Sequence, residues 1–403
     1  MIIHKADILV PEKNIDYSKW SVIACDQFTS DKNYWQSIYN YTKNCPSTIN
    51  FIIPEAFIDK TKEFDCCNNI LQAVNNKYFS TLKDCYILVD RQTPYHNHRL
   101  GLVCSVDLED YDFCENTKSI IRPSEGTLWE RIVPRIDVRE KSLIEFPHII
   151  LLFDDRKFNI LENLYHKKDN FKQVYDFDLS GGGGHITGYM ITKDLSSVTQ
   201  KLLNKDYLKQ TFNTTEQLAF IVGDGNHSLA TAKTCWEKIK TTLSDEEKQT
   251  HNARFCLVEI CNINDPGIEF YPIHRVIFNC DKSVINDLKN IYTKPDKVAY
   301  KLYYDNNYDE YFLPPNTVEG ISLVQNYIEQ YLKKYPSSTV DYIHDKDNVI
   351  SACKGNSLGI FLPVIEKKDI FEYVIKKGVL PKKSFSIGKS VEKRYYLEGK
   401  FIK

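Results

Sequence analysis

Side chains able to do chemistry are concentrated in the turn Gly223-Asp224-Gly225-Asn226-His227-Ser228. The apolar run 219–222 before it predicts a short buried strand, and 229–240 after it predicts a helix. The turn therefore lies at a helix N-terminus, where unpaired N–H groups and the helix dipole favour an anion. This predicts a site for phosphate or carboxylate. A purely structural turn stays open, because Asp, Asn and Ser are ordinary capping residues and glycine supplies positive φ.

A second polar segment contains three arginines, a carboxylate and a hydroxyl around a glycine turn. Arg122, Arg131 and Arg135 provide guanidinium donors for phosphate oxygens. Glu125 provides a general base, and Thr127 provides a hydroxyl. The alternative is a charged, solvated face.

Glycines and paired basic residues mark two more segments. Four consecutive glycines ending at Gly184 precede His185 and resemble a loop whose N–H groups approach a phosphate, although a lid or linker fits equally well. His274 and Arg275 lie in an apolar frame. In a strand their side chains point to opposite faces, so at most one faces a given pocket.

The C-terminal segment carries the cations Lys389, Lys393 and Arg394, which fit either an anion pocket or a solvated tail. Its Gly-Lys-Ser at 388–390 is not a P-loop, because Lys383 stands where the first glycine is required. A Walker nucleotide site is therefore excluded.

The elements that position these residues alternate between strand-like and helix-like patterns without a repeat. The segments 85–90 and 100–108 predict a hairpin, and 294–317, rich in Tyr, Asp, Asn and Pro, predicts a linker or exposed excursion. The other expected strands are 148–153, 188–192, 253–262 and 358–364, and the other expected helices are 196–210 and 323–334. The pattern indicates a mixed α/β (α+β) fold and not a regular doubly wound sheet.

Composition limits the function classes. The chain has 403 residues and a net charge of −2, so no global basic field indicates nucleic acid. No apolar run has the length of a signal peptide core or a membrane span. The twelve cysteines lack zinc-site spacing and are expected to be reduced, mostly in the core. We expect a cytoplasmic protein with no membrane or nucleic-acid partner.

The Gly-Asp-Gly-Asn-His turn followed by a helix resembles the signature of ParB/sulfiredoxin-like folds. Together with 122–127 and 274–275, it is similar to a long uncharacterised-domain family of that superfamily, which resembles diphosphate-dependent free serine kinase. Sulfiredoxins have a nucleophilic Cys at the position of Asn226. Sulfiredoxins and ParB proteins both have a phosphate-binding arginine at the position of Ser228. Thiol chemistry of that kind is therefore not expected, and phosphate charge must be met by other cations.

The resemblance implies a phosphotransferase that moves a phosphoryl group from pyrophosphate to the hydroxyl of free L-serine, with Mg²⁺, in serine and cysteine metabolism. It also implies a ParB/sulfiredoxin-like catalytic core at 119–285. This core is flanked by an N-terminal α/β region at 1–118 and a C-terminal region at 286–403 that contributes basic residues. The oligomeric state stays open.

Roles for the candidate residues follow from what phosphoryl transfer requires. The catalytic residues are Glu125, as base on the serine hydroxyl, Asp224, as runner-up or as the Mg²⁺ ligand, and His227. The phosphate-binding residues are Arg122, Thr127, Arg131, Arg135, Gly225, Asn226, Ser228, His274, Arg275, Lys389 and Arg394. The substrate-binding residues are Asp26, Gln27, Gly183, Gly184 and His185. Asp26 and Gln27 would bind the serine amine, and the alternative for them is to cap a helix at 31–41.

Two rival functions remain at this point. An ADP- or ATP-dependent serine kinase needs the same residues and a pocket for the base. A ParB-like nucleotide-binding module needs an element that reads DNA, and no basic helix-turn-helix is found in the sequence.

Overall fold

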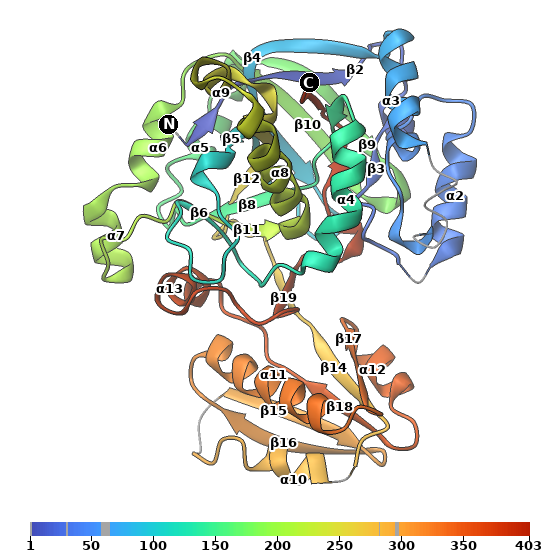
Figure 1. The fold of residues 1–403 in the computed structure, drawn as a ribbon, viewed down its shortest axis with the longest axis vertical. Coiled ribbons are helices and arrows are strands. Elements are labelled where there is room, and N and C mark those ends of the chain that lie inside the picture. Colours follow the sequence, from blue (N-terminus) through green and yellow to red (C-terminus); the bar gives the residue numbers. More distant parts are fainter. Residues whose placement is uncertain (1, 30, 58–64, 282, 295–297) are drawn as a thin grey trace. The chain divides into compact units, whose positions relative to one another are not determined.

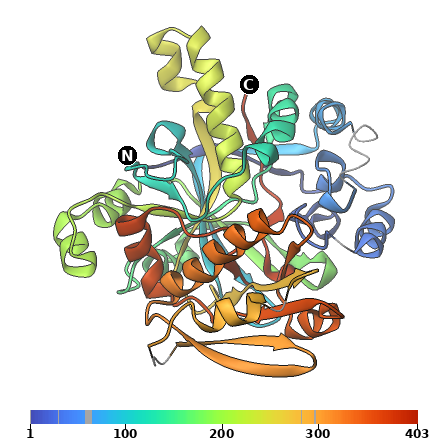
Figure 2. The same ribbon diagram turned by 60° about the horizontal axis from the view of Figure 1, so that its bottom comes forward.

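A computed structural model describes residues 2–29, 31–57, 65–281, 283–294 and 298–403 (Figures 1 and 2). Contacts within the chain define two compact units. The first consists of Met1–Pro123, Thr127–Ile268 and Gly388–Lys403, and the second of Ser124–Gly126 and Glu269–Ile387. These bounds differ from those of the three regions expected from the sequence, and the functions assigned to those regions stay predictions.

A ten-stranded mixed sheet forms the centre of the first unit, within the described residues. Its main path is β6-β11-β8-β12-β5-β4-β10-β9, with β1 beside β5 and β2 beside β4. Two pairs, β11 with β6 and β12 with β8, are parallel, and the other pairs are antiparallel. The strands are β1 Ile3–His4, β2 Ala6–Pro11, β4 Phe79–Gln92, β5 Leu100–Asp107, β6 Ile121–Pro123, β8 Ile150–Phe153, β9 Lys172–Leu179, β10 Gly184–Ile191, β11 Phe220–Asp224 and β12 Phe255–Asn262.

Helices and two short strand pairs complete the first unit. The helices α4 and α8 lie side by side and contact each other (Figures 1 and 2). The strand pairs are β3 Val22–Ile23 with β20 Tyr395–Tyr396, and β7 Ile144–Glu145 with β21 Lys400–Phe401. The helices are α1 Tyr17–Trp20, α2 Lys32–Thr42, α3 Cys66–Asn75, α4 Trp129–Lys141, α5 Leu161–Tyr165, α6 Ser196–Leu202, α7 Lys205–Phe212, α8 Asn226–Ile239 and α9 Asp245–Thr250.

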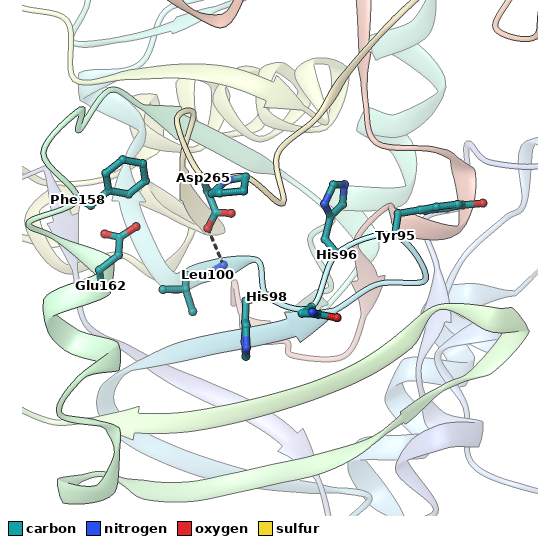
Figure 3. A pocket seen from close by; sticks show the side chains of 9 residues that line it. Tyr95, His96, His98, Leu100, Phe158, Glu162 and Asp265 are labelled. Atoms are coloured by element: carbon teal, nitrogen blue, oxygen red, sulfur yellow. Dashed lines mark hydrogen bonds between the residues drawn. The ribbon is translucent and has the colours of Figure 1, made fainter.

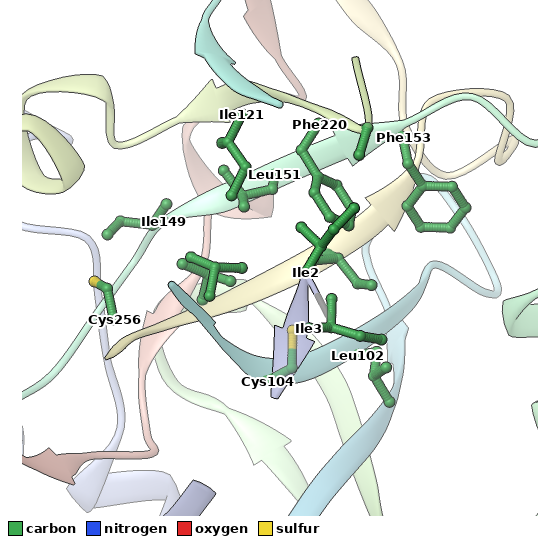
Figure 4. Packing of buried hydrophobic residues seen from close by; sticks show 14 of the residues in the cluster. Ile2, Ile3, Leu102, Cys104, Ile121, Ile149, Leu151, Phe153, Phe220 and Cys256 are labelled. Carbon is green, nitrogen blue, oxygen red and sulfur yellow. The ribbon is translucent and has the colours of Figure 1, made fainter. Parts of the chain in front are cut away.

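The central sheet is buried on both faces, because successive residues of its middle strands belong to different hydrophobic clusters. In β5, Leu102 and Cys104 belong to one cluster (Figure 4). Trp236 of α8 belongs to the same cluster. Val103 belongs to the other cluster, with Trp20 and other residues. This two-sided burial explains why β5 has no polar residue from Leu100 to Cys104 and is buried along its whole length.

The second unit is built on a five-stranded sheet of order β16-β15-β18-β14-β17, beside a separate pair of β13 and β19. Its strands are β13 Phe270–Pro272, β14 His274–Phe278, β15 Val298–Tyr304, β16 Asn307–Leu313, β17 Thr339–Ile343, β18 Ser357–Phe361 and β19 Phe385–Ile387. Its helices are α10 Ser283–Lys289, α11 Thr317–Lys334, α12 Lys346–Ala352 and α13 Lys367–Lys377.

The mixed α/β class predicted from the sequence is confirmed, as is the hairpin, which is the antiparallel pair of β4 and β5. The predicted helix at 196–210 is two helices, α6 and α7. The segment 294–317 was predicted to be a linker or an exposed excursion. The linker was wrong, because residues 298–313 form the β15–β16 hairpin, although β16 is largely exposed. Residues 295–297 lie outside the described residues. Tyrosines suit a pleated surface and so override the turn-like composition there.

All twelve cysteines are free, as expected. Among the described residues, no helix has the length and apolar character needed to cross a membrane.

Candidate functional site

The turn between β11 and α8 requires glycine at one position. Gly225 has φ 78° and forms the N-cap of α8 in a left-handed conformation. A Cβ there would lie 3.0 Å from Ile149 Cα. The N–H of Gly225 donates to Asp224 Oδ1 at 2.9 Å, and no side chain caps the helix. The helix begins at Asn226, three residues before the predicted start, so His227 and Ser228 belong to its first turn.

A lysine from the C-terminal segment reaches this turn. Lys393 Nζ donates to Asp224 Oδ2 at 3.1 Å, and the two side chains are only 9% and 17% exposed. The backbone of Lys393 is fixed as well, because its carbonyl accepts a hydrogen bond from Arg91. A nearly buried ammonium is thus held at the N-terminus of α8, where helix dipole and ammonium are both positive.

Asp26 belongs to the same cluster. Its Oδ1 accepts a hydrogen bond of 3.0 Å from Gln27 Nε2. Burial raises the pKa of Asp26, but interactions with His148, Gln27 and Lys393 outweigh it and leave this pKa below its usual value. Asp26 is therefore a half-buried, ionised carboxylate whose charge interacts with that of Lys393. The Lys393 ammonium therefore lies near the predicted substrate residue Asp26 and contacts the predicted catalytic residue Asp224.

Beside Asp26, Tyr396 connects two further groups. Its hydroxyl lies 2.9 Å from His148 Nδ1 and 3.1 Å from Cys25 Sγ. Burial raises the pKa of Cys25 to about 12, so this thiol is protonated at neutral pH and is not a nucleophile.

His227 faces the segment that follows Glu125. Its Nε2 accepts a hydrogen bond of 3.3 Å from the N–H of Leu128. The neighbouring Thr127 Oγ1 is buried and has no hydrogen-bond partner within the described residues. The structure therefore brings the 127–128 backbone to the first turn of α8, as expected if both segments serve one site.

Two of the three predicted arginines of this segment have partners elsewhere in the protein. Arg122 is buried, donates to the carbonyls of Ser119 and Gln217, and pairs with Glu216 at 2.6 Å. Arg135 binds the carbonyl of Arg131 and Glu55, both at 2.6 Å, and Arg131 itself is exposed. The guanidinium groups of Arg122 and Arg135 are therefore committed to contacts within the protein.

The other cations predicted in the C-terminal segment also have protein partners. Arg394 is buried between Glu259 at 2.7 Å and Glu398 at 2.8 Å, and these carboxylates raise its pKa despite burial, so it is a charged structural residue. Lys389 Nζ lies 4.0 Å from the centroid of the Tyr95 ring. Among these C-terminal cations, Lys393 is the one that contacts Asp224.

The glycine run has a packing explanation. A Cβ on Gly183 would lie 2.3 Å from Tyr395 Oη, and Gly184 has φ 86°. His185 is held by Asp176 at 2.6 Å and Asp178 at 2.7 Å on β9. Burial opposes its charge, but these two carboxylates raise the pKa of His185. Its imidazole is therefore committed to cross-strand pairs.

Glu125, His274 and Arg275 belong to the second unit. Glu125 accepts backbone N–H groups from Lys383 and Ser384, both at 3.0 Å. Burial raises the pKa of Glu125, although these two N–H groups oppose the shift. Arg275 is fully buried, and burial lowers its pKa to about 10, so it remains charged at neutral pH.

His274 is neutral at pH 7. Burial, with the positive charges of Lys346 and Arg275 nearby, lowers its pKa to about 4. Its Nδ1 accepts the N–H of Leu362 at 3.2 Å, which requires an unprotonated Nδ1. At neutral pH it therefore lacks the charge that a phosphate contact would use.

We predict that stability falls on acidification through His274. Its folded pKa of about 4 lies below the ordinary value of 6.5, so the unfolded chain takes up the proton first and stability is lost as pH falls from about 6.5 to 4. The loss is on the order of 3 kcal/mol at most. Urea unfolding midpoints at pH 7 and pH 5 measure it. His274→Gln should reduce the difference between the two midpoints, and the same change at exposed His166 should not. An equal pH dependence in all three proteins would refute the assignment.

Sequence reasoning missed His148 and Tyr396. His148 directly precedes an apolar strand and Tyr396 lies in the last tenth of the chain, so neither carries a motif. Their contact spans 248 positions and only the folded chain brings them together.

Comparison with protein families bears on this arrangement. The model of a family described as "Protein of unknown function (DUF1015)" matches residues 9–340. The chain belongs to this family. The DUF1015 match confirms that part of the sequence resemblance which pointed to a long uncharacterised-domain family. The ParB/sulfiredoxin-like superfamily and the pyrophosphate donor stay predictions. None of the curated proteins matches this DUF1015 member.

Several solved structures are similar to this DUF1015 chain. A conserved hypothetical protein from Pyrococcus furiosus is 13% identical, with a TM-score of 0.36, and the match covers 73% of this chain and 90% of that one. A free serine kinase in complex with AMP is 11% identical, with a TM-score of 0.40 and coverages of 74% and 92%. SbnI with a C-terminal truncation, from Staphylococcus aureus, is 10% identical, with a TM-score of 0.39 and coverages of 73% and 85%. At these TM-scores we draw no conclusion from the likeness.

Proposed function

We propose that this protein is a phosphotransferase that phosphorylates the hydroxyl of free L-serine, with pyrophosphate as donor. The observation that carries the proposal is the buried ammonium of Lys393, held by Asp224 at the N-terminus of α8. Phosphoryl transfer requires mainly positioning and neutralisation of charge, and the site supplies both with few groups.

The donor would bind at the first turn of α8. A lysine acts as a point charge for phosphate oxygens, and helix N-termini bind them through N–H groups. Lys393 is pre-positioned by two contacts, to Asp224 and through its own carbonyl to Arg91, so little ordering is needed when a donor binds. His227 in the same turn would contact the transferred phosphoryl group.

The acceptor would bind beside Asp26. Because Asp26 is ionised and half-buried, it suits the ammonium of an amino acid, with Gln27 fixing its orientation. Asp224 would orient the serine hydroxyl. Glu125, the base expected from the sequence, remains the rival for that role.

Mg²⁺ fits this proposal only in company with the donor. Among the described residues, no group of three or more His, Cys, Asp or Glu side chains is arranged to hold a metal ion. Mg²⁺ usually binds through one or two carboxylates, several waters and the phosphates of the substrate, so a complete protein cage is not required. Asp224, the Mg²⁺ ligand expected from the sequence, is the group that would hold it, and the ion would neutralise charge on the donor.

The test is to incubate the purified protein with L-serine, Mg²⁺ and pyrophosphate, ADP or ATP in separate reactions. We expect O-phosphoserine with pyrophosphate and at least about ten times less with either nucleotide, because the chain has no P-loop. D-serine is the matched control for the acceptor. If O-phosphoserine forms with ADP or ATP but not with pyrophosphate, the proposed donor is wrong and the proposed serine kinase activity stands. No product with any donor would refute the proposed function.

A further inference from the structure

A cavity of about 550 Å³ lies in the first unit, apart from the cluster described above. Phe158 and Glu162 line one side, and Tyr95, His96 and His98 line another (Figure 3). Asp224 pairs with Ile150, the first residue of β8, whereas the cavity residues Phe158 and Glu162 follow Phe153, its last residue. At about 3.3 Å per residue, the four residues of β8 span roughly 13 Å.

Phe158 is presented to this cavity in an unusual backbone conformation. It has φ 55°, a region that bulky side chains rarely adopt, and its side chain is 38% exposed. The loop is held by Asp155, whose Oδ2 accepts the N–H groups of Asn159 at 2.6 Å and Ile160 at 2.9 Å. A glycine would adopt this conformation without strain. An exposed aromatic ring at a strained position is the kind of feature that binding sites retain.

Glu162 gives the cavity its polarity. Its Oε2 is buried and has no hydrogen-bond partner within the described part of the chain. Burial, with the carboxylates of Asp155 and Asp265, raises the pKa of Glu162. Asp265 is itself occupied, since its two oxygens accept the N–H groups of Leu100 at 3.0 Å and Gly267 at 2.7 Å. A positive group beside Glu162 would therefore relieve the repulsion among three carboxylates and supply the missing donor.

The chemistry of the lining selects the class of ligand. The described lining residues form no group of three or more side chains able to hold a metal ion. An anion would face the two carboxylates of the lining, Glu162 and Asp265. A small organic cation suits both the carboxylate and the aromatic ring, because its ammonium group donates to a carboxylate and its apolar part packs against a ring.

We propose that this cavity binds a small organic cation, whose ammonium group donates to Glu162 Oε2 and whose apolar part packs against the ring of Phe158. Binding requires no phosphoryl donor, so the proposal stands or falls independently of the proposed reaction.

The first test compares two probes of equal shape, benzylamine and benzyl alcohol, titrated at pH 7 by calorimetry without serine or donor. We expect benzylamine to bind at least ten times more tightly than benzyl alcohol. Glu162→Gln should weaken benzylamine at least ten-fold, and the matched change at exposed Glu246 on α9 should not. Equal affinity for the two probes, no binding of benzylamine, or unchanged affinity in the Glu162 variant would overturn the proposal.

The second test separates binding from stability. Phe158→Gly removes the backbone strain, so its thermal unfolding midpoint should equal or exceed that of the unmodified protein, while benzylamine affinity falls at least five-fold. A lowered midpoint with unchanged affinity would make Phe158 a packing residue and remove it from the site.

Discussion

Replacing Lys393 by Met should lower the rate of O-phosphoserine formation about 100- to 1,000-fold. An effect of this size is typical when an enzyme loses one pre-organised group that stabilises the negative charge developing in the transition state. Met keeps much of the length and the apolar stem, so the side chain still fills its nearly buried position. The measurement is the initial rate with saturating L-serine and pyrophosphate, together with the thermal unfolding midpoint.

Lys389 is the matched control, because it belongs to the same segment but its ammonium lies over Tyr95. Lys389→Met should retain at least half of the activity. Lys393→Arg keeps the positive charge and should recover part of what Lys393→Met loses. If Lys393→Met is folded and as active as the Lys389 variant, the ammonium at α8 has no part in the reaction.

Asp224→Asn should reduce turnover about 100- to 10,000-fold, because the change removes both the proton acceptor and the charge that holds Lys393. An amide of the same shape still accepts the N–H of Gly225, so the turn should survive. The rate with saturating serine is measured beside pyrophosphate binding. A variant that retains most of its turnover would make Asp224 a structural residue of the turn.

Glu125→Gln tests whether Glu125 or Asp224 acts as the base on the serine hydroxyl. Both Glu125 oxygens accept backbone N–H groups, so an amide would turn its NH₂ towards one of those donors. We therefore expect a lower unfolding midpoint of the second unit with turnover within about five-fold of the unmodified protein. If the variant binds pyrophosphate normally and is as stable as the unmodified protein, but its turnover falls steeply, Glu125 is the base.

Local features were predictable from the sequence because they depend on short-range physics. The turn after β11 follows from two glycines between an apolar run and a helix former, and α8 begins there in the structure. The β4–β5 hairpin follows from two apolar runs around a polar tip. The expectation of a linker failed at 294–317, where side chains that favour turns alternate with tyrosines that favour strands.

Partners distant in the chain were not predictable, because residue type does not specify them. An arginine near a glycine turn suggests phosphate, but Arg122 is buried and paired with Glu216, and Arg394 is paired with Glu259. The contact between Lys393 and Asp224 spans 169 positions. Nothing in the sequence favoured one of the three cations of that segment, Lys389, Lys393 and Arg394. The fold of the backbone determines that the ammonium of Lys393 reaches the turn.

The segment 388–403 belongs to the first unit, although the second unit occupies most of the chain between Ile268 and Gly388. During synthesis the ribosome therefore releases β11 and α8 long before it releases Lys393 and Tyr396. A nascent chain can pair the early strands of the first unit, but β20 cannot join β3 until the second unit has also left the ribosome. The first unit would therefore fold completely only after the second unit has been synthesised, and a chain that stops before Lys393 would lack the ammonium that contacts Asp224.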